Sequence, residues 1–514
     1  MRNRIVVPVA AALLTLAGTA FSAEFQPMGA LGIGGAGVAR TTNAMAGHWN
    51  PAGLAFNEKA VSVPISVATG LRVSKGLADN VDRLSKFTEG DPSTLDNLKN
   101  INTAVVDAQA LGDIVGLLSV LKDIETEKGT ISLSGNAVVA VQVKHFAFGA
   151  FGTIEGFAKP ETDLVNVLPS DTGGTAAVTQ TEFANLAAAP GVDLADSSLF
   201  FTDTQLRGDI VNSLTANGFT TQQAENILNA LDVELAGSGT VTQGQAADVL
   251  ANTVAPAFTS GGSIDDNETS VLVKSLAYVE FPISYGHPID LGQYGKLGIG
   301  VSLKPIRGRV YASQLKLVED DSVDSGNITD NLDKNYTESN SITIDLGAFY
   351  KYKNWNVGLV AKNLTSPKFD APDLKDQNGQ FVLDGGGNRI RSDKVTLKPQ
   401  VRLGVAMDAL SWLTIAADLD LTDNETVLSS LDYKSRHFGG GIEAHPLTWL
   451  KLRAGMYKNL SNDDIGPVAT AGLTFGTKWV NFDLDGAYGL ESARYEEKDY
   501  PREARVQGSL NVQF

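Results

Sequence analysis

The last eleven residues of the chain, 504–514, alternate between two kinds of side chain. Polar side chains, from Arg505 to Gln513, fall on one face of an extended strand, and the opposite face carries Ala504, Val506, Leu510, Val512 and Phe514. Such alternation over about ten residues is what a membrane-spanning β-strand needs, with one face toward lipid and one toward a polar lumen. A single strand would leave backbone groups unpaired in hydrocarbon. The remaining chain is therefore expected to supply the strands that close a barrel.

Alternation and turn signals predict fourteen such strands in the sequence. They span residues 60–74, 131–143, 146–158, 269–286, 294–312, 340–352, 355–365, 394–408, 412–423, 432–445, 449–459, 466–477, 480–491 and 503–514. The connections between them alternate between long and short, as in barrels with extracellular loops and short periplasmic turns. The predicted fold is therefore all-β and membrane-embedded, a 14-stranded antiparallel outer-membrane β-barrel over residues 60–514.

Four tryptophans support this count of strands. Trp355, Trp412, Trp449 and Trp479 stand at or just before the starts of alternate predicted strands. They therefore fall at one level, the periplasmic rim, where amphipathic rings anchor a barrel among lipid head groups. A soluble β-sandwich has no need for four tryptophans at one level.

Composition excludes several classes of protein. The net charge of −18 argues against a nucleic-acid partner, which would favour clustered Lys and Arg. Cysteine is absent, which excludes disulfides, thiol catalysis and thiolate metal sites. The mean hydropathy of −0.04 suits a barrel, because only every second strand residue faces lipid.

The chain begins with a pattern typical of a secretory signal peptide over residues 1–23. Arg2 and Arg4 form a basic start, an apolar run follows, and small residues near Ser22 and Ala23 suit cleavage. A signal peptide combined with spanning strands predicts the outer membrane of a Gram-negative cell after cleavage. The expected surroundings are outer-membrane lipid and lipopolysaccharide.

Three segments do not read as barrel strands. Residues 24–59 are rich in glycine and small side chains, which suits packing inside the barrel as an N-terminal plug or hatch. The insertions 75–130 and 159–268 show helical periodicity and fall on the extracellular side. We expect two helical extracellular insertions, which act either as a lid or binding surface or as a bulky shield.

The order of these features resembles a known family. A glycine-rich segment that ends in Asn50-Pro51-Ala52-Gly53-Leu54, followed by the strands, is similar to the FadL-like outer-membrane transporters of hydrophobic compounds. The closer resemblance is to the TraF-like outer-membrane family, of the F-plasmid transfer operon type. It rests on the segments MGALGIGGAGVAR, HWNPAGLA, LGIGVSLKPIRGRVY, VGLVAKNL, LKPQVRLGVAMD and LTIAADLDLTDNE.

The resemblance implies a function. A FadL-like barrel would be a passive uptake channel for small hydrophobic molecules such as long-chain fatty acids. The alternative is a cell-surface protein of conjugal transfer or secretion, in which the barrel only anchors the insertions. An apolar pocket above the hatch would favour the first, and a lumen filled with salt bridges the second.

Candidate residues for the ligand route come from the hatch and from one strand. Trp49, Asn50, Pro51 and Gly53 belong to the expected hatch turn. On strand 146–158, the glycines that would permit a kink and a lateral opening are Gly149, Gly152 and Gly156.

Strand parity predicts a network of charges in the lumen. Its members are Lys304, Arg307, Arg309, Arg402, Asp418, Asp420, Glu443, Asp483 and Asp485. A bulge at Pro305 would turn Arg307 and Arg309 inward together with Lys304. The charges either receive an anionic head group or pair across the lumen to hold barrel and plug together. The second interpretation is favoured, because acids and bases alternate between strands.

The sequence offers no pattern for catalysis or for metal binding. No serine has the Gly-x-Ser-x-Gly setting of a hydrolase, and the five histidines lack metal-ligand spacing. The acidic segment 319–330 lacks the spacing of an EF-hand. We therefore expect no enzyme activity, no cofactor and no metal.

Overall fold

The computed structural model describes residues 26–88, 93–99, 108–170, 177–187, 199–236, 241–316, 333–425, 427 and 434–514. The predicted signal peptide, 1–23, and the acidic segment 319–330 lie outside these residues.

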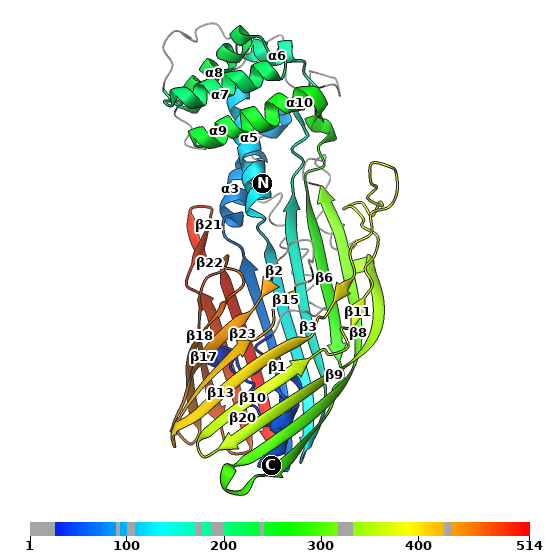
Figure 1. Cartoon of the computed structure of the whole chain (residues 1–514), viewed down its shortest axis with the longest axis vertical. Helices are drawn as coiled ribbons and strands as arrows, with labels where there is room; N and C mark the ends of the chain where they lie inside the picture. The colour runs from blue at the N-terminus through cyan, green and yellow to red at the C-terminus, as the bar shows by residue number, and fades with distance from the viewer. Residues whose placement is uncertain are drawn as a thin grey trace.

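Antiparallel strands close into a barrel (Figure 1). They are β1 (Val61–Val73), β2 (Ile131–Val143), β3 (Phe146–Glu161), β6 (Ser270–Glu280), β7 (Ile283–Asp290), β8 (Lys296–Lys316), β9 (Tyr336–Tyr352), β10 (Trp355–Lys362), β13 (Gln400–Leu410), β14 (Leu413–Asp420), β17 (His437–Leu447), β18 (Leu450–Asn459), β19 (Val468–Gly476), β20 (Val480–Gly489) and β23 (Glu503–Gln513). β1 pairs with both β2 and β23, and β2 pairs with β3, which closes the ring. β6 and β7 share one position between β3 and β8, so the predicted 14-stranded barrel is confirmed.

The fourth predicted strand, 269–286, differs in detail. It is interrupted at Phe281 and Pro282 and continues as β7 to Asp290. Proline has no N–H to donate to a neighbouring strand, which explains the gap at Pro282, while the register against β3 and β8 continues without a shift. The strands predicted at 394–408 and 432–445 also begin later, at Gln400 and His437.

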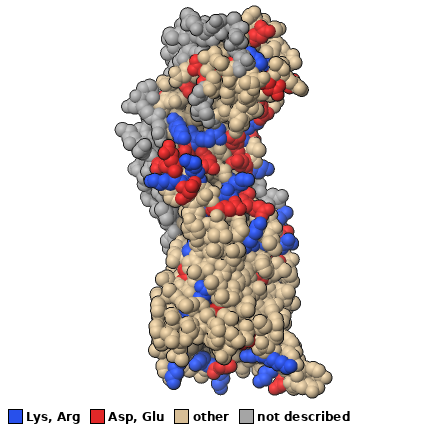
Figure 2. All heavy atoms as spheres, turned by 90° about the vertical axis from the view of Figure 1, so that its left-hand side faces the viewer, with Lys and Arg blue, Asp and Glu red and all other residues tan. Residues whose placement is uncertain are grey.

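The two ends of the barrel are different. Short hairpins and Phe514 lie at one end, here called the turn end, and the long connections lie at the other, the loop end (Figure 1). The tryptophans at 355, 412, 449 and 479 are half-exposed and stand at hairpins of the turn end. Figure 2 shows a broad outer belt with few charged atoms between a charged rim at the turn end and mixed charges toward the loop end. This is the surface that a membrane-spanning barrel requires.

Both insertions contain helices at the loop end. Insertion 75–130 holds α3 (Leu77–Thr88), α4 (Thr94–Leu98) and α5 (Ala108–Glu127), and insertion 159–268 holds α6 (Gln180–Leu186), α7 (Thr204–Ala216), α8 (Thr221–Leu235), α9 (Gln243–Val249), a π-helical turn η3 (Leu250–Val254), α10 (Ala255–Ser260) and a 3-10 turn η4 (Ile264–Asp266). Capping boxes begin α8, at Thr220, and α9, at Thr242. Leu118, Leu121, Leu231 and Leu250 lie in one core that joins the two insertions into a helical head. No helix among the described residues has the length and apolar character to cross a membrane.

Short two-stranded ladders complete the loop end. They are β4 (Asn166–Leu168) with β5 (Gly262–Ser263), β11 (Lys368–Phe369) with β12 (Val395–Thr396), β15 (Asn424–Glu425) with β16 (Lys434–Ser435), and β21 (Ser492–Tyr495) with β22 (Lys498–Pro501). The β11–β12 ladder lies at the barrel mouth, where Phe369 of β11 and Leu397, just after β12, pack against Phe157 and Tyr278 of the wall. These residues form an apolar cluster on one side of the upper lumen. A single 3-10 turn, η5 (Gly292–Tyr294), joins β7 to β8 at the turn end.

Candidate functional site: the plug and its seat

The N-terminal segment folds inside the barrel as a compact plug. It contains η1 (Leu31–Ile33), α2 (Ala46–Trp49) and η2 (Pro51–Phe56), and nearly all of its side chains between Met28 and Ala55 are buried. The Trp49 indole N–H donates to the carbonyl oxygen of Met28 at 2.7 Å. A Cβ atom at Gly37 would lie 2.3 Å from the Trp49 ring, so only glycine fits beneath it. The plug is therefore held by internal packing as well as by the barrel.

Asn50 ties the plug to the barrel wall. Its amide nitrogen donates to the carbonyl oxygens of Val38, at 3.3 Å, and of Ala348 on β9, at 2.9 Å. Its side-chain oxygen accepts from the Ala52 N–H at 3.1 Å and so caps η2, while Pro51 occupies the first turn, where no N–H is needed. A Cβ at Gly53 would lie 2.2 Å from the Thr41 carbonyl oxygen. The expected hatch turn is thus where the plug meets strand β9.

Inward-facing glycines of the wall let the plug backbone approach closely. A Cβ at Gly300 would lie 2.2 Å from the Ala52 nitrogen, and one at Gly347 would lie 2.0 Å from the Asn50 side-chain oxygen. The same close approach occurs at Gly298 of β8 and on other strands, at Gly286, Gly358, Gly404, Gly439, Gly455 and Gly472. The barrel is therefore shaped to hold this plug in one position.

Asp418 binds the middle of the plug. One of its carboxylate oxygens accepts from the backbone N–H groups of Gly37, at 2.8 Å, and Val38, at 2.9 Å. Its neighbour Asp420 pairs with Arg402 at 2.7 Å. The Arg402 guanidinium also lies 5.9 Å from the Trp49 ring centre.

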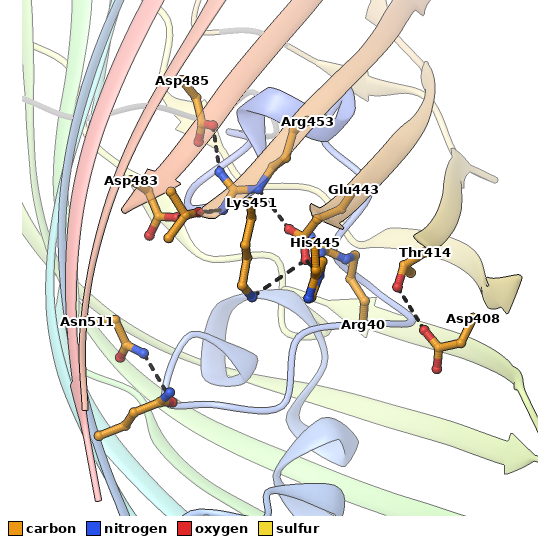
Figure 3. A network of polar contacts seen from close by, with 12 residues as sticks. Arg40, Asp408, Thr414, Glu443, His445, Lys451, Arg453, Asp483, Asp485 and Asn511 are labelled. Atoms are coloured by element: carbon orange, nitrogen blue, oxygen red, sulfur yellow. Dashed lines mark hydrogen bonds and ion pairs between the residues drawn. The ribbon is translucent and has the colours of Figure 1, made fainter. Parts of the chain in front are cut away.

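A second cluster joins the plug to the wall near the turn end (Figure 3). Glu443 accepts from Arg40 of the plug and from Arg453 of β18, each at 2.8 Å. Arg453 reaches on to Asp485 at 2.8 Å and to Asp483 at 2.5 Å. All of these side chains except Asp485 line a polar cavity of about 590 Å³ beneath the plug. The cluster links the plug to three strands through charge-assisted contacts.

Lys304 lies above the plug and is almost completely buried. Its ammonium group contacts Glu280 at 2.7 Å, Asp345 at 2.8 Å and the Asn363 side-chain oxygen at 3.0 Å. The ammonium group therefore connects β8 to β6, to β9 and to the end of β10.

Arg307 and Arg309 do not join the lumenal network. The register of β8 against β9 runs without a shift past Pro305, so no bulge forms and parity continues. Both arginines therefore point outward, where they pair with Glu338 at 2.6 and 2.9 Å. The prediction that they face inward was wrong, because a proline at an outward position with its neighbours in register does not reverse the alternation.

The three glycines of β3 take different positions. Gly149 faces inward, directly across from the interruption in the neighbouring strand, while Gly152 and Gly156 lie on the outward face. β3 keeps an unbroken register along β2, so the expected kink is not in this strand. A gap of two residues between strands lies one strand further on, at Phe281 and Pro282, where the register against β3 and β8 continues without a shift.

Sequence reasoning missed three members of the site. Glu280 is the partner of Lys304, Arg40 is the plug's contact with Glu443, and Phe151 stacks on His48 of the plug with ring centres 6.0 Å apart. Inward parity was the available signal for Glu280 and Phe151. Arg40 gave none, because the plug has no regular periodicity.

A closed barrel of this kind, with a folded N-terminal segment seated in its lumen, defines a plugged transmembrane β-barrel of the outer-membrane type. The sequence matches the family described as "F plasmid transfer operon, TraF, protein" over residues 48–420. The chain belongs to this family, as the sequence resemblance had indicated.

Solved structures similar to the chain include FadL-like transporters. The toluene transporter TbuX of Ralstonia pickettii is 12% identical with a TM-score of 0.43, over 96% of this chain and 99% of that chain. The Pseudomonas putida toluene transporter TodX is 11% identical with a TM-score of 0.39, over 96% and 97%. A FadL homologue of Pseudomonas aeruginosa is 10% identical with a TM-score of 0.40, over 96% and 99%. Among curated proteins, none matches the sequence.

Proposed function

We propose that the chain is a passive outer-membrane channel for small hydrophobic molecules such as long-chain fatty acids. In this proposal the loop end is extracellular and the turn end periplasmic. The observation that carries it is the interruption of the wall beside the plug. Phe281 and Pro282 lie between β6 and β7, across from Gly149 and Ala150 of β3. Pro282 has no N–H to donate, while the Phe281 N–H donates to the Pro305 carbonyl oxygen of β8 at 2.9 Å.

The plug lies directly against this interruption. A Cβ at Gly47 of the plug would lie 2.9 Å from the Ser284 hydroxyl and 4.0 Å from Pro282. On the outer surface, Phe281 is 47% exposed and Ile283 is 51% exposed, so the interruption lies on the lipid-facing belt. A shift of the plug at this point would connect the lumen sideways with the bilayer.

A packed apolar cluster lies in the upper lumen, on the loop-end side of the plug. Phe157, Leu276, Tyr278 and Phe369 form a cluster in the upper lumen. Below it, Phe151 stacks on His48 at the top of the plug. A hydrophobic solute would pass from this cluster along Phe151 to the wall, and no energy source is required because the solute gains apolar surroundings in the bilayer.

The lumenal ion pairs favour the second candidate, a barrel that anchors the helical head for surface assembly. Lys304, Arg402 and Arg453 each pair with acids of the wall. Such pairs hold the plug and wall in place without offering a cation to a ligand. The two candidates differ in whether the lateral route is ever used.

A reversible crosslink tests that route. The chain has no cysteine, so Ala150→Cys with Phe281→Cys places a single disulfide across the interruption. The control pair, Val139→Cys with Ala150→Cys, joins register partners in the intact wall between β2 and β3. We expect oxidation of the first pair to abolish fatty-acid uptake into proteoliposomes, reduction to restore it, and the control pair to transport in both states.

Two results would count against the proposal. Unchanged uptake through the oxidised Ala150–Phe281 pair would refute the lateral route. Absence of uptake by the correctly folded unmodified protein would refute the channel and favour the anchor.

A further inference from the structure

A separate cleft lies on the barrel wall at the loop end, away from the plug. It has a volume of about 670 Å³ and lies between helices α3 and α5 and the strands β23, β1, β2, β3 and β6. Its surface is mainly aliphatic and includes Leu71, Leu133 and Val271 of the strands with Val81, Leu84 and Leu121 of the helices. The volume falls within the range of about 300–1,000 Å³ typical of small-molecule sites.

Strand register places the wall of this cleft on the lipid side of the barrel. Leu71 of β1 pairs with Leu133 of β2 and with Ala504 of β23. Successive side chains alternate between faces, so Leu71 shares its face with Val67, and Leu133 shares its face with Val139. Val67 is 59% exposed and Val139 is 51% exposed on the outer belt. The cleft is therefore continuous with the lipid-facing surface.

The height of the cleft matches the upper edge of the bilayer's hydrocarbon. Leu71 lies ten residues along β1 from Val61, which is at the turn end. At about 3.3 Å per residue and a strand tilt of about 40°, this distance is roughly 25 Å along the barrel axis, the height of the apolar band of such barrels. Acyl chains of the leaflet nearest the head can therefore reach the cleft.

The helical head forms the roof of the cleft and is fixed over it. Arg83 of α3 pairs with Asp123 of α5 at 2.7 Å. The β21–β22 hairpin lies below α3, and the Glu496 N–H donates to Asp82 of α3 at 3.0 Å (Figure 1). The cleft is thus a built cavity between two parts of the chain.

From this geometry we infer that the cleft binds one hydrocarbon chain of a membrane lipid in the outer leaflet. Among the described residues that line it, Arg505 is the one charged residue, and it pairs with Glu503, which is buried. A free fatty acid would bring a carboxylate with no cation available in the cleft. A lipid tail requires none, because its head group stays at the bilayer surface. The bound tail would join the helical head to the membrane as well as to the barrel.

This inference does not depend on transport and is tested separately. Three single-cysteine variants each carry a nitroxide. The label on Val81→Cys lies in the cleft, the label on Val67→Cys lies on the lipid-facing wall, and the label on Lys86→Cys lies on the exposed side of α3. All three are reconstituted in phospholipid vesicles free of fatty acid, and folding is checked by heat-modifiable migration on gels. Collision with oxygen, which concentrates in lipid, is compared with collision with a water-soluble nickel chelate.

We expect Val81→Cys to resemble Val67→Cys, with high oxygen and low nickel accessibility, and Lys86→Cys to show the reverse. Nickel accessibility at Val81→Cys equal to that at Lys86→Cys would overturn the inference, because the cleft would hold water. Low accessibility to both reagents would also overturn it, because the cleft would be closed by protein. A lipid-like signal that appears only after fatty acid is added would show a free ligand and overturn the lipid source.

A second measurement uses a variant that fills the cleft. Val81→Trp places an indole in the cavity, and Lys86→Trp is the matched control on the same helix. Native mass spectrometry from mild detergent should show one retained lipid fewer for Val81→Trp than for the unmodified protein and for the control. Equal lipid retention in all three would contradict the inference.

Discussion

Replacement of Asn50 by Ala tests whether the plug is held by the contacts described above. Asn50 is fully buried, and its side chain bonds Val38, Ala348 and Ala52. Loss of the cap on Ala52 costs about 1 kcal/mol, and a buried group left without a partner costs about 1–3 kcal/mol. The carbonyl oxygens keep part of their bonding in the strand and turn. We therefore expect the free energy that favours the closed plug to fall by about 2–4 kcal/mol.

This energy predicts a measurable change in plug opening. Since about 1.4 kcal/mol is a factor of ten, the open population should rise roughly 30- to 700-fold. Hydrogen–deuterium exchange of peptides covering residues 45–56 measures this population, while peptides of β18 report on the barrel. We expect faster exchange in the plug peptides and unchanged exchange in the barrel.

The matched control is Asn43→Ala. Asn43 accepts from the Met45 N–H at 3.0 Å within the plug and is partly exposed. Its replacement should change plug exchange much less than Asn50→Ala does. If Asn50→Ala left the exchange of residues 45–56 within about threefold of the original, the reasoning that buried hydrogen bonds hold the plug to β9 would be refuted.

Two further predictions concern buried charge. Lys304→Met leaves the carboxylates of Glu280 and Asp345 buried without their cation, so unfolding free energy should fall by about 3–5 kcal/mol in denaturant titration; an unchanged midpoint would contradict this. Burial, with Lys362 and Lys304 nearby, lowers the pKa of His48 well below 6.5. The folded plug therefore binds fewer protons than the released plug. The stability of the closed plug should be greatest above about pH 6.5 and should fall as the pH drops below that value, which hydrogen–deuterium exchange of the plug peptides would measure. His48→Phe should remove this dependence; if it persisted, another group would be responsible.

Much of the barrel could be predicted because its signal is local. Whether a side chain faces lipid or lumen depends on a period of two residues. This period can be recognised within a single strand such as β13 or β20. The tryptophans at the turn end are also a local signal, because each lies at a hairpin. The inward orientation of Asp418, Glu443 and Asp485 also follows from parity alone.

The predictions were wrong at two prolines, because the effect of a proline on a strand was judged from the sequence alone. Pro305 was expected to shift parity and did not, so Arg307 and Arg309 point outward. Pro282 leaves a gap between β6 and β7, whereas alternation predicts one continuous strand over 269–286. The difference depends on the neighbouring strands, because a proline disturbs a ladder only where a partner requires its missing N–H.

The sequence by itself determined the barrel, its strand order and the existence of a small-residue plug. Only the tertiary structure decided that Asn50 bonds Ala348, that Arg40 reaches Glu443, and that α3 and α5 roof a cleft on the lipid-facing wall. The alternation of side chains can be recognised from neighbouring residues in the sequence. These contacts join segments that are far apart in the chain, and their positions depend on how the barrel closes and how the insertions pack upon it.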